Sequence, residues 1–169
     1  DVIYQTDDQG RFTFVNPIVT RMMGYSPQEL LGRRFIELVR PDAHAATERF
    51  YGWQSVRKTP STYYEFPALT KDGREIWIGQ NVQVLLENGR VTGFHAVARD
   101  ITERKKAEEA LRSTTEYLRA LIQTSPLAII NLDPAINVMN WNRAAEDMLG
   151  WSESEVLGKP LPYVPAEKE

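Results

Sequence analysis

Apolar and polar residues alternate in two short segments at the start of the chain, residues 2–6 and 11–15. Such alternation is typical of β-strands that bury one face, because successive side chains of a strand point to opposite sides. Asp7-Asp8-Gln9-Gly10 separates the two segments with residue types that favour a tight turn. The pattern therefore predicts a β-hairpin.

Helix boundary signals follow this hairpin. Asn16 and Pro17 are typical of an N-cap and a first helical residue, and Gly24 is typical of a helix end. Ser26 and Glu29 have the spacing of a capping box, in which each side chain bonds to the backbone of the other residue. We therefore expect two short helices in succession.

A longer helix is predicted at residues 43–56, which contain no helix breaker before Gly52. Ala46, Phe50 and Trp53 recur there at helical spacing and predict one buried stripe. This helix would cover one face of a sheet.

Three strand candidates follow from Thr62 onward, divided by the hairpin signals Lys71-Asp72-Gly73 and Glu87-Asn88-Gly89. Sequential strands joined by tight turns pair antiparallel. Two strands, small helices and a three-stranded meander predict an α+β domain of about 100 residues, with its helices gathered on one face of the sheet.

The chain also contains an internal repeat. Residues 24–32 recur as residues 150–158, and Asn16 falls on Asn142 at the same offset of 126 positions. An offset of this size corresponds to a whole domain and a linker, rather than to a solenoid repeat. We expect the following division: a complete domain at 1–104, a helical linker at 105–125, and the incomplete N-terminal part of a second domain at 126–169.

The second copy is short for a domain. About 43 residues rarely enclose a core without disulfides or a partner. We therefore expect Trp141, Leu149 and Trp151 to belong to a surface that lacks its sheet, and residues 127–169 to be loosely held, partnered with another chain, or packed on the first domain.

Composition narrows the classes of function. With 42% hydrophobic and 25% charged residues, the 169-residue chain is ordinary globular material. A net charge of -3, from 20 basic and 23 acidic residues, gives no basic patch for nucleic acid. No apolar run approaches the ~18 residues of a membrane span, so we expect no membrane segment and a cytoplasmic location. The absence of cysteine excludes disulfides and thiolate chemistry.

Several motifs in the predicted order resemble those of the PAS sensory domain family with its C-terminal PAC-type motif. The resemblance covers nearly all of residues 1–104 and resumes near Leu127. It implies a five-stranded antiparallel sheet with helices on one face, and often a small-molecule pocket between them. The motifs are Gly10, Asn16-Pro17, residues 24–32, Lys71-Asp72-Gly73-Arg74, and Gly93 through Arg99-Asp100-Ile101-Thr102-Glu103-Arg104.

The expected pocket lies on the apolar face of the sheet. Alternation along residues 74–85 puts Ile78, Gln80 and Val82 on one side of their strand. Similarity to PAS domains that hold flavin extends this set, so that the expected pocket residues are Tyr64, Phe66, Ala68, Ile78, Gln80, Val82, Phe94, Ala96 and Ala98, with Phe50 and Trp53 from the helix. Gln80 is the amide able to orient a ligand. The alternative is a buried amide satisfied by its neighbours, in a pocket packed shut by Phe50, Trp53 and Phe66.

The sequence does not identify a cofactor. Without cysteine a covalent flavin adduct cannot form, whereas noncovalent flavin or a small organic ligand remains compatible. Haem is disfavoured, because His44 lies about three residues before the position of the axial ligand in haem-binding PAS domains. We expect His44 to be an exposed first-turn residue, and His95 to lie on the face opposite the pocket. No metal site and no catalytic constellation is recognised, so an enzyme is not expected.

Residues 102–123 have helix-forming composition, with Thr102 as the expected N-cap. A weak heptad seam runs along this segment, with Leu111 and Leu118 at position a and Ala107, Thr114 and Leu121 at position d. The seam predicts a parallel homodimer. The alternative is an amphipathic helix that lies on its own sheet.

The resemblance and the helix together predict a signal relay. Asp100, Ile101 and Thr102 stand where the last pocket strand becomes the helix, so a shift of the strand would change the helix. We expect a sensory module of a multidomain bacterial-type signalling protein, either a sensor histidine kinase or a cyclic-dinucleotide enzyme. Its partner would be the kinase or other output domain of the same polypeptide. The alternative is a ligand-free PAS module for dimerisation or interaction.

Overall fold

The computed structural model describes residues 1–162. The chain divides into two compact units, Asp1–Ala107 and Glu108–Glu169. The boundary between the units falls inside a long helix.

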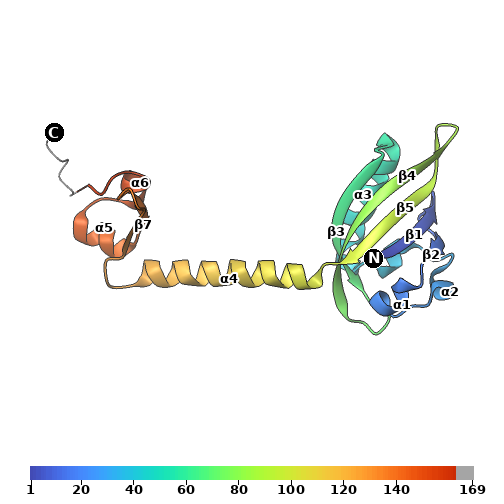
Figure 1. The fold of residues 1–169 in the computed structure, drawn as a ribbon, viewed down its shortest axis with the longest axis horizontal. Helices are drawn as coiled ribbons and strands as arrows, with labels where there is room; N and C mark the ends of the chain where they lie inside the picture. The colour runs from blue at the N-terminus through green and yellow to red at the C-terminus, as the bar shows by residue number, and fades with distance from the viewer. Residues whose placement is uncertain (163–169) are drawn as a thin grey trace. The chain divides into compact units, whose positions relative to one another are not determined.

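The first unit is built on a five-stranded antiparallel sheet with the strand order β2-β1-β5-β4-β3 (Figure 1). Short helices precede the meander, and their side chains share one hydrophobic core with the sheet. This architecture confirms the predicted α+β fold class. The strands are β1 (Val2–Asp7), β2 (Phe12–Val15), β3 (Ser61–Leu69), β4 (Glu75–Glu87) and β5 (Arg90–Asp100), and the helices are α1 (Ile18–Met23), α2 (Pro27–Leu30), η1 (Phe35–Leu38), η2 (Pro41–Ala43) and α3 (His44–Arg57).

The alternation read from the sequence sets the two faces of β4. Ile76, Ile78, Gln80 and Val82 are buried, while Asn81 is exposed. Hairpin geometry follows from local chemistry as well. Asn88 and Gly89 join β4 to β5 with φ values of 51° and 76°, the left-handed pair that a tight hairpin turn requires.

The start of α1 differs from the prediction. Pro17 occupies the N-cap position and no side chain caps the helix, so Asn16 is not an N-cap. Gly24 ends the helix in the left-handed conformation, with φ 80°, as predicted. The capping box is confirmed: the backbone N–H of Ser26 donates to Glu29, and the Ser26 hydroxyl accepts from the Glu29 N–H.

The buried stripe of α3 is displaced by one residue from the predicted one. Its buried residues are Thr47, Tyr51 and Gln54. Gln54 can be buried because its amide donates hydrogen bonds to the carbonyls of Thr59 and Val82. A buried polar group needs such partners. Trp53 is 47% exposed as a result.

The long helix α4 spans Thr102–Thr124. Thr102 is its first residue rather than its cap, because the Lys105 N–H already donates to the carbonyl of Ile101. None of the residues of α4 is buried. In the part of the chain that the structure describes, no helix combines the length and apolar composition that a membrane span requires.

The second unit contains a two-stranded sheet and two short helices around a small core. Trp141 is fully buried in this core, and its indole N–H donates to the carbonyl of Trp151 at 2.9 Å. The expectation that Trp141 lies on a surface without cover is therefore wrong, because the fragment folds around it. Leu149 packs against the same core, and Trp151 is 38% exposed. The elements are β6 (Ile130–Leu132), β7 (Val138–Trp141), α5 (Arg143–Leu149) and α6 (Glu153–Val156).

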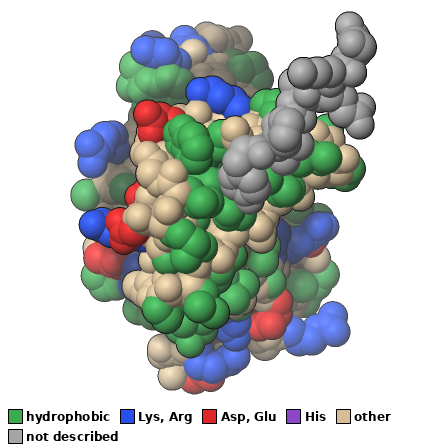
Figure 2. All heavy atoms as spheres, turned by 90° about the vertical axis from the view of Figure 1, so that its left-hand side faces the viewer, with side chains coloured by type: hydrophobic (Ala, Val, Ile, Leu, Met, Phe, Trp, Pro, Cys, Tyr) green, Lys and Arg blue, Asp and Glu red, His purple; other side chains and the backbone are tan. Residues whose placement is uncertain are grey.

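Other large apolar side chains of the second unit stay exposed, among them Met139 at 64% and Met148 at 70%. Figure 2 shows hydrophobic side chains, in green, exposed on the face turned to the viewer.

Candidate ligand cavity and helix junction

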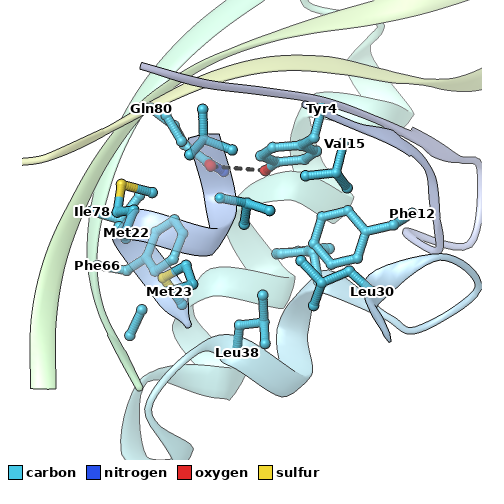
Figure 3. A pocket seen from close by; sticks show the side chains of 15 residues that line it. Tyr4, Phe12, Val15, Met22, Met23, Leu30, Leu38, Phe66, Ile78 and Gln80 are labelled. Atoms are coloured by element: carbon cyan, nitrogen blue, oxygen red, sulfur yellow. Dashed lines mark hydrogen bonds between the residues drawn. The ribbon is translucent and has the colours of Figure 1, made fainter. Parts of the chain in front are cut away.

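An apolar cavity of about 50 Å³ lies between the sheet and the short helices of the first unit (Figure 3). A second cavity of about 30 Å³ lies beside it, and Tyr4, Phe35 and Gln80 line both. The first cavity is walled by apolar side chains from the sheet, from α1 and from α2. Volumes of this size accommodate one or a few water-sized groups.

Gln80 forms the polar centre between the two cavities. Its Oε1 accepts a hydrogen bond of 2.7 Å from the Tyr4 hydroxyl, and its Nε2 donates to the Tyr51 hydroxyl at 2.8 Å. Burial raises the pKa of both tyrosines, so each hydroxyl stays protonated. The Tyr51 hydroxyl is therefore a donor that can face a ligand in the smaller cavity.

The structure separates the predicted pocket residues into four groups, the last of which is Trp53 alone. Most of them line a cavity: Phe66, Ala68, Ile78, Gln80 and Ala98 line the larger one, and Gln80, Val82 and Phe94 line the smaller one. Ala96 is buried in the core but lines neither cavity. Phe50 and Tyr64 stack on each other at 4.2 Å between ring centroids, beside the core.

Trp53 does not belong to the cavity. Its ring lies on the exposed side of α3, where the Arg57 guanidinium stands 4.5 Å from the ring centroid. The shift of the α3 stripe explains this error, since the neighbouring position Gln54 is the one that turns inward.

Several cavity residues escaped the sequence analysis. Tyr51 was missed because of the same shift of the α3 stripe, and Tyr4 because strand β1 was not assigned to the pocket. Helix residues Met22, Met23 and Leu30 close the cavity opposite the sheet (Figure 3). The apolar positions of α1 and α2 carried the signal for them, but short helices give too few turns to define a face.

The cavity does not fit haem or flavin in this conformation. Sites for ligands of drug size enclose about 300–1,000 Å³, several times the volume present here. The one histidine near α3 is also engaged: His44 is half-buried, rather than exposed as predicted, and its Nε2 donates to the carbonyl of Val39 at 2.8 Å. A molecule of a few heavy atoms fits the cavity better, and the flexible side chains of Met22 and Met23 would let it expand.

Strand β5 contributes to the cavity wall and leads directly into α4. Ala98 lines the larger cavity, and Asp100 accepts hydrogen bonds from the N–H and the hydroxyl of Thr102. The Thr102 hydroxyl in turn accepts from the N–H of Trp77 at 2.9 Å, and the Ile101 N–H donates to the Trp77 carbonyl. Since Ile78 follows Trp77 and also lines the cavity, the start of α4 is hydrogen-bonded to the backbone of cavity strand β4 and continues directly from cavity strand β5.

Glu65 connects a third strand to the same helix. Its carboxylate accepts from Arg104 at 2.6 Å and pairs with Lys105 at 2.7 Å. The ammonium of Lys105 holds the pKa of Glu65 at about 2, below its usual range. The next residue, Phe66, lines the cavity. This connection was absent from the sequence analysis, because no local pattern links Glu65 to residues about 40 positions away.

Comparisons with known proteins agree with this architecture. A family model described as the PAS fold matches residues 1–101 and 116–169. The chain is 31% identical over 129 residues to the "Methyl sulfide methyltransferase-associated sensor" of Methanosarcina acetivorans, and 36% identical over 98 residues to the "Probable diguanylate cyclase DgcE" of Escherichia coli. The first match covers 76% of this chain and 13% of the relative, and the second covers 57% and 9%.

Among solved structures, a sensory box histidine kinase/response regulator from Burkholderia thailandensis is similar, with a TM-score of 0.59 and 25% identity. That match covers 71% of this chain and 91% of the other. The chain spans only a small part of the curated relatives, which are much longer signalling proteins. Sheet order, cavity position and the matched residues lead to one conclusion: the chain belongs to the PAS family.

Proposed function

We propose that the first unit senses a small molecule in the cavity around Gln80 and passes its state to α4. One observation carries this proposal: residues that wall the cavity are one or two positions away from residues bonded to the start of α4. Occupancy that moves β4 or β5 by a fraction of an ångström would therefore act on the helix. Such a bias needs a ligand with different affinities for two states, typically worth ~1–3 kcal/mol.

The ligand class follows from the cavity lining. A compact, apolar molecule with one polar group would fill the larger space and exchange hydrogen bonds with Gln80 or Tyr51. The cavity volume of about 50 Å³ supports a ligand of a few heavy atoms.

The parent protein is proposed to be a multidomain signalling protein, a sensor histidine kinase or a cyclic-dinucleotide enzyme. The diguanylate cyclase and histidine kinase among the similar proteins support this proposal. Catalysis would then belong to an output domain outside these residues, and that domain would be the downstream partner of α4. A cytoplasmic location and the division at residues 104 and 126 remain predictions from the sequence.

A second candidate function is a ligand-free relay and dimerisation module. The small volume of the cavity and the completed Tyr4–Gln80–Tyr51 hydrogen bonds favour it. In this alternative, α4 forms a parallel homodimer. Leu111, Leu118 and Leu121 are 69%, 52% and 48% exposed, so the proposed seam is open to a second copy of the chain.

Ligand binding separates the two candidates. The purified protein is denatured and its extract is analysed by mass spectrometry, and thermal unfolding is then followed against a panel of small metabolites. The sensor proposal predicts a compound that raises the melting temperature by several degrees at ~100 times its Kd. The rise should vanish in Ala98→Leu, which fills the cavity, and persist in Val97→Leu on the other face of β5. An empty extract and a panel without effect would leave the ligand-free module as the function.

A further inference from the structure

Asn142 is a buried residue of the second unit that completes every hydrogen bond its amide can form. Its Oδ1 accepts from the N–H groups of Ile129, at 2.8 Å, and Ala145, at 3.1 Å. Its Nδ2 donates to the carbonyls of Ile122, at 2.9 Å, and Leu127, at 2.8 Å. The side chain is 0% exposed. Two donor and two acceptor positions are the whole capacity of an amide.

These four bonds join the end of α4 to the start of the second PAS copy. Ile122 lies in the last turn of α4, where carbonyls lack partners within the helix. Ala145 lies in the first turn of α5, and its N–H donates to the Asn142 backbone carbonyl at 2.9 Å as well as to Oδ1. A second contact runs in parallel, because the Arg143 N–H donates to the Gln123 side chain at 3.1 Å.

The internal repeat offers a comparison with Asn16, the same position in the first copy. Both residues donate their backbone N–H to the carbonyl of the corresponding isoleucine, Asn16 to Ile3 in β1 and Asn142 to Ile129 just before β6. The Nδ2 of Asn16 donates to the carbonyl of Asp1 at 3.3 Å. Its Oδ1 is buried and accepts no hydrogen bond from any residue in the range 1–162.

The asparagines at equivalent positions of the two copies therefore differ in their hydrogen bonds. Where a carbonyl of a helix end holds the amide nitrogen, the oxygen is aimed at the next helix and caps it. In the first copy the amide nitrogen donates to the Asp1 carbonyl, the oxygen has no partner among residues 1–162, and the next helix, whose N-cap is Pro17, has no side-chain cap.

We infer that Asn142 is the positioning residue through which movement of α4 reaches the second unit. When the last turn of α4 shifts or unwinds, Nδ2 loses the carbonyl of Ile122. Oδ1 then loses the orientation that caps α5 and bonds the segment before β6. This inference concerns the receiving end of the helix and does not depend on the identity of a ligand in the first unit.

The test distinguishes the role of the Asn142 amide oxygen, which accepts hydrogen bonds, from that of the amide nitrogen, which donates them. Asn142→Asp keeps an acceptor oxygen for the N–H groups of Ile129 and Ala145, since aspartate is a good N-cap. It removes the donor and places a carboxylate beside the carbonyls of α4. Ala120→Gly, at an exposed position, loosens the last turn of α4 directly. Amide hydrogen exchange of the 169-residue chain is measured by NMR for the wild type, each variant and the double variant.

When Asn142 is intact, Ala120→Gly is expected to accelerate exchange at the Ile129 and Ala145 amides by about threefold to tenfold. When it is added to Asn142→Asp, the acceleration should be less than about twofold. Asn16→Asp serves as the matched control and should leave these amides unchanged. Equal acceleration with and without Asn142→Asp, or none in either case, would overturn the inference. General loss of protection across β7 and α5 in Asn142→Asp alone would also overturn it, since Asn142 would then serve only to stabilise the core.

Discussion

At the scale of the residue, Gln80 decides whether the buried hydroxyl groups at the centre of the first unit have hydrogen-bond partners. It is 2% exposed, and it is the common partner of Tyr4 and Tyr51. A buried hydroxyl without a partner loses its bonds to water and gains nothing in exchange. The same amide could exchange one of these bonds for a bond to a ligand.

Gln80→Leu is expected to lower the free energy of unfolding by ~1–3 kcal/mol, because it leaves both tyrosine hydroxyls unpaired. Urea denaturation followed by circular dichroism measures the change. Gln83→Leu, at an exposed position of the same strand, is the control and should change stability by less than about 0.5 kcal/mol. Equal effects of the two substitutions would show that the buried hydrogen bonds do not matter.

The sequence predicted single residues well where the period was unambiguous. In β4 a period of two over many positions put Ile78, Gln80 and Val82 on the inner face. In α3 the buried stripe contains the polar residues Thr47 and Gln54 beside Tyr51. A prediction based on hydrophobicity therefore selected the neighbouring residues Phe50 and Trp53. A buried glutamine is recognised only when its partners are known, and those partners are distant in the sequence.

At the scale of the element, the first turn of α4 is held by strand β3 as well as by β5, the strand that directly precedes it. Glu65 binds Arg104 and Lys105, and Lys105 also stands 5.0 Å from the ring centroid of Trp77. Such contacts with the strands add to the stability that the first turn gains from helix propensity. The junction is therefore sensitive to the charge of one carboxylate.

The contribution of Glu65 should depend on pH in a defined window. Lys105 holds the pKa of the folded state at about 2, while the ordinary value is 4.5. A depressed pKa means that the stabilisation is present above pH ~4.5 and is lost as the pH falls toward ~2. Unfolding free energies of the wild type and Glu65→Gln, measured from pH 6 to pH 2, should therefore converge at the acid end. Lys105→Gln should weaken this pH dependence, and a difference that stays constant to pH 2 would contradict it.

The exposed seam of α4 gives a prediction about assembly. If the helix dimerises through Leu111 and Leu118, replacing both with lysine should convert the protein from a dimer to a monomer in light scattering. Ser113→Lys with Ala120→Lys adds the same charge at the same spacing on another face of the helix, and should leave the mass unchanged. A wild type with the mass of one 19.4 kDa chain would exclude this seam as a dimer contact at the concentration used.

At the scale of the whole molecule, the repeat in the sequence corresponds to two stretches, residues 1–101 and 116–169, that the PAS family model matches and whose surroundings differ. The order of motifs was sufficient to predict the sheet, the hairpins and α4. It did not predict that the second copy would bury Trp141, because that core depends on how Leu161 and Val156 close over β7. It also did not predict the cavity volume, which is the small difference between the space enclosed and the side chains that fill it.

The central claim is that the cavity and the start of α4 are coupled, and xenon tests it without knowledge of the natural ligand. Xenon enters apolar cavities in proteins. Under xenon pressure, NMR should show shifts of the Ile78 and Ala98 methyl groups together with the amides of residues 102–105, all with the same dependence on xenon concentration. Shifts confined to the methyl groups, or no shift at all, would contradict the coupling.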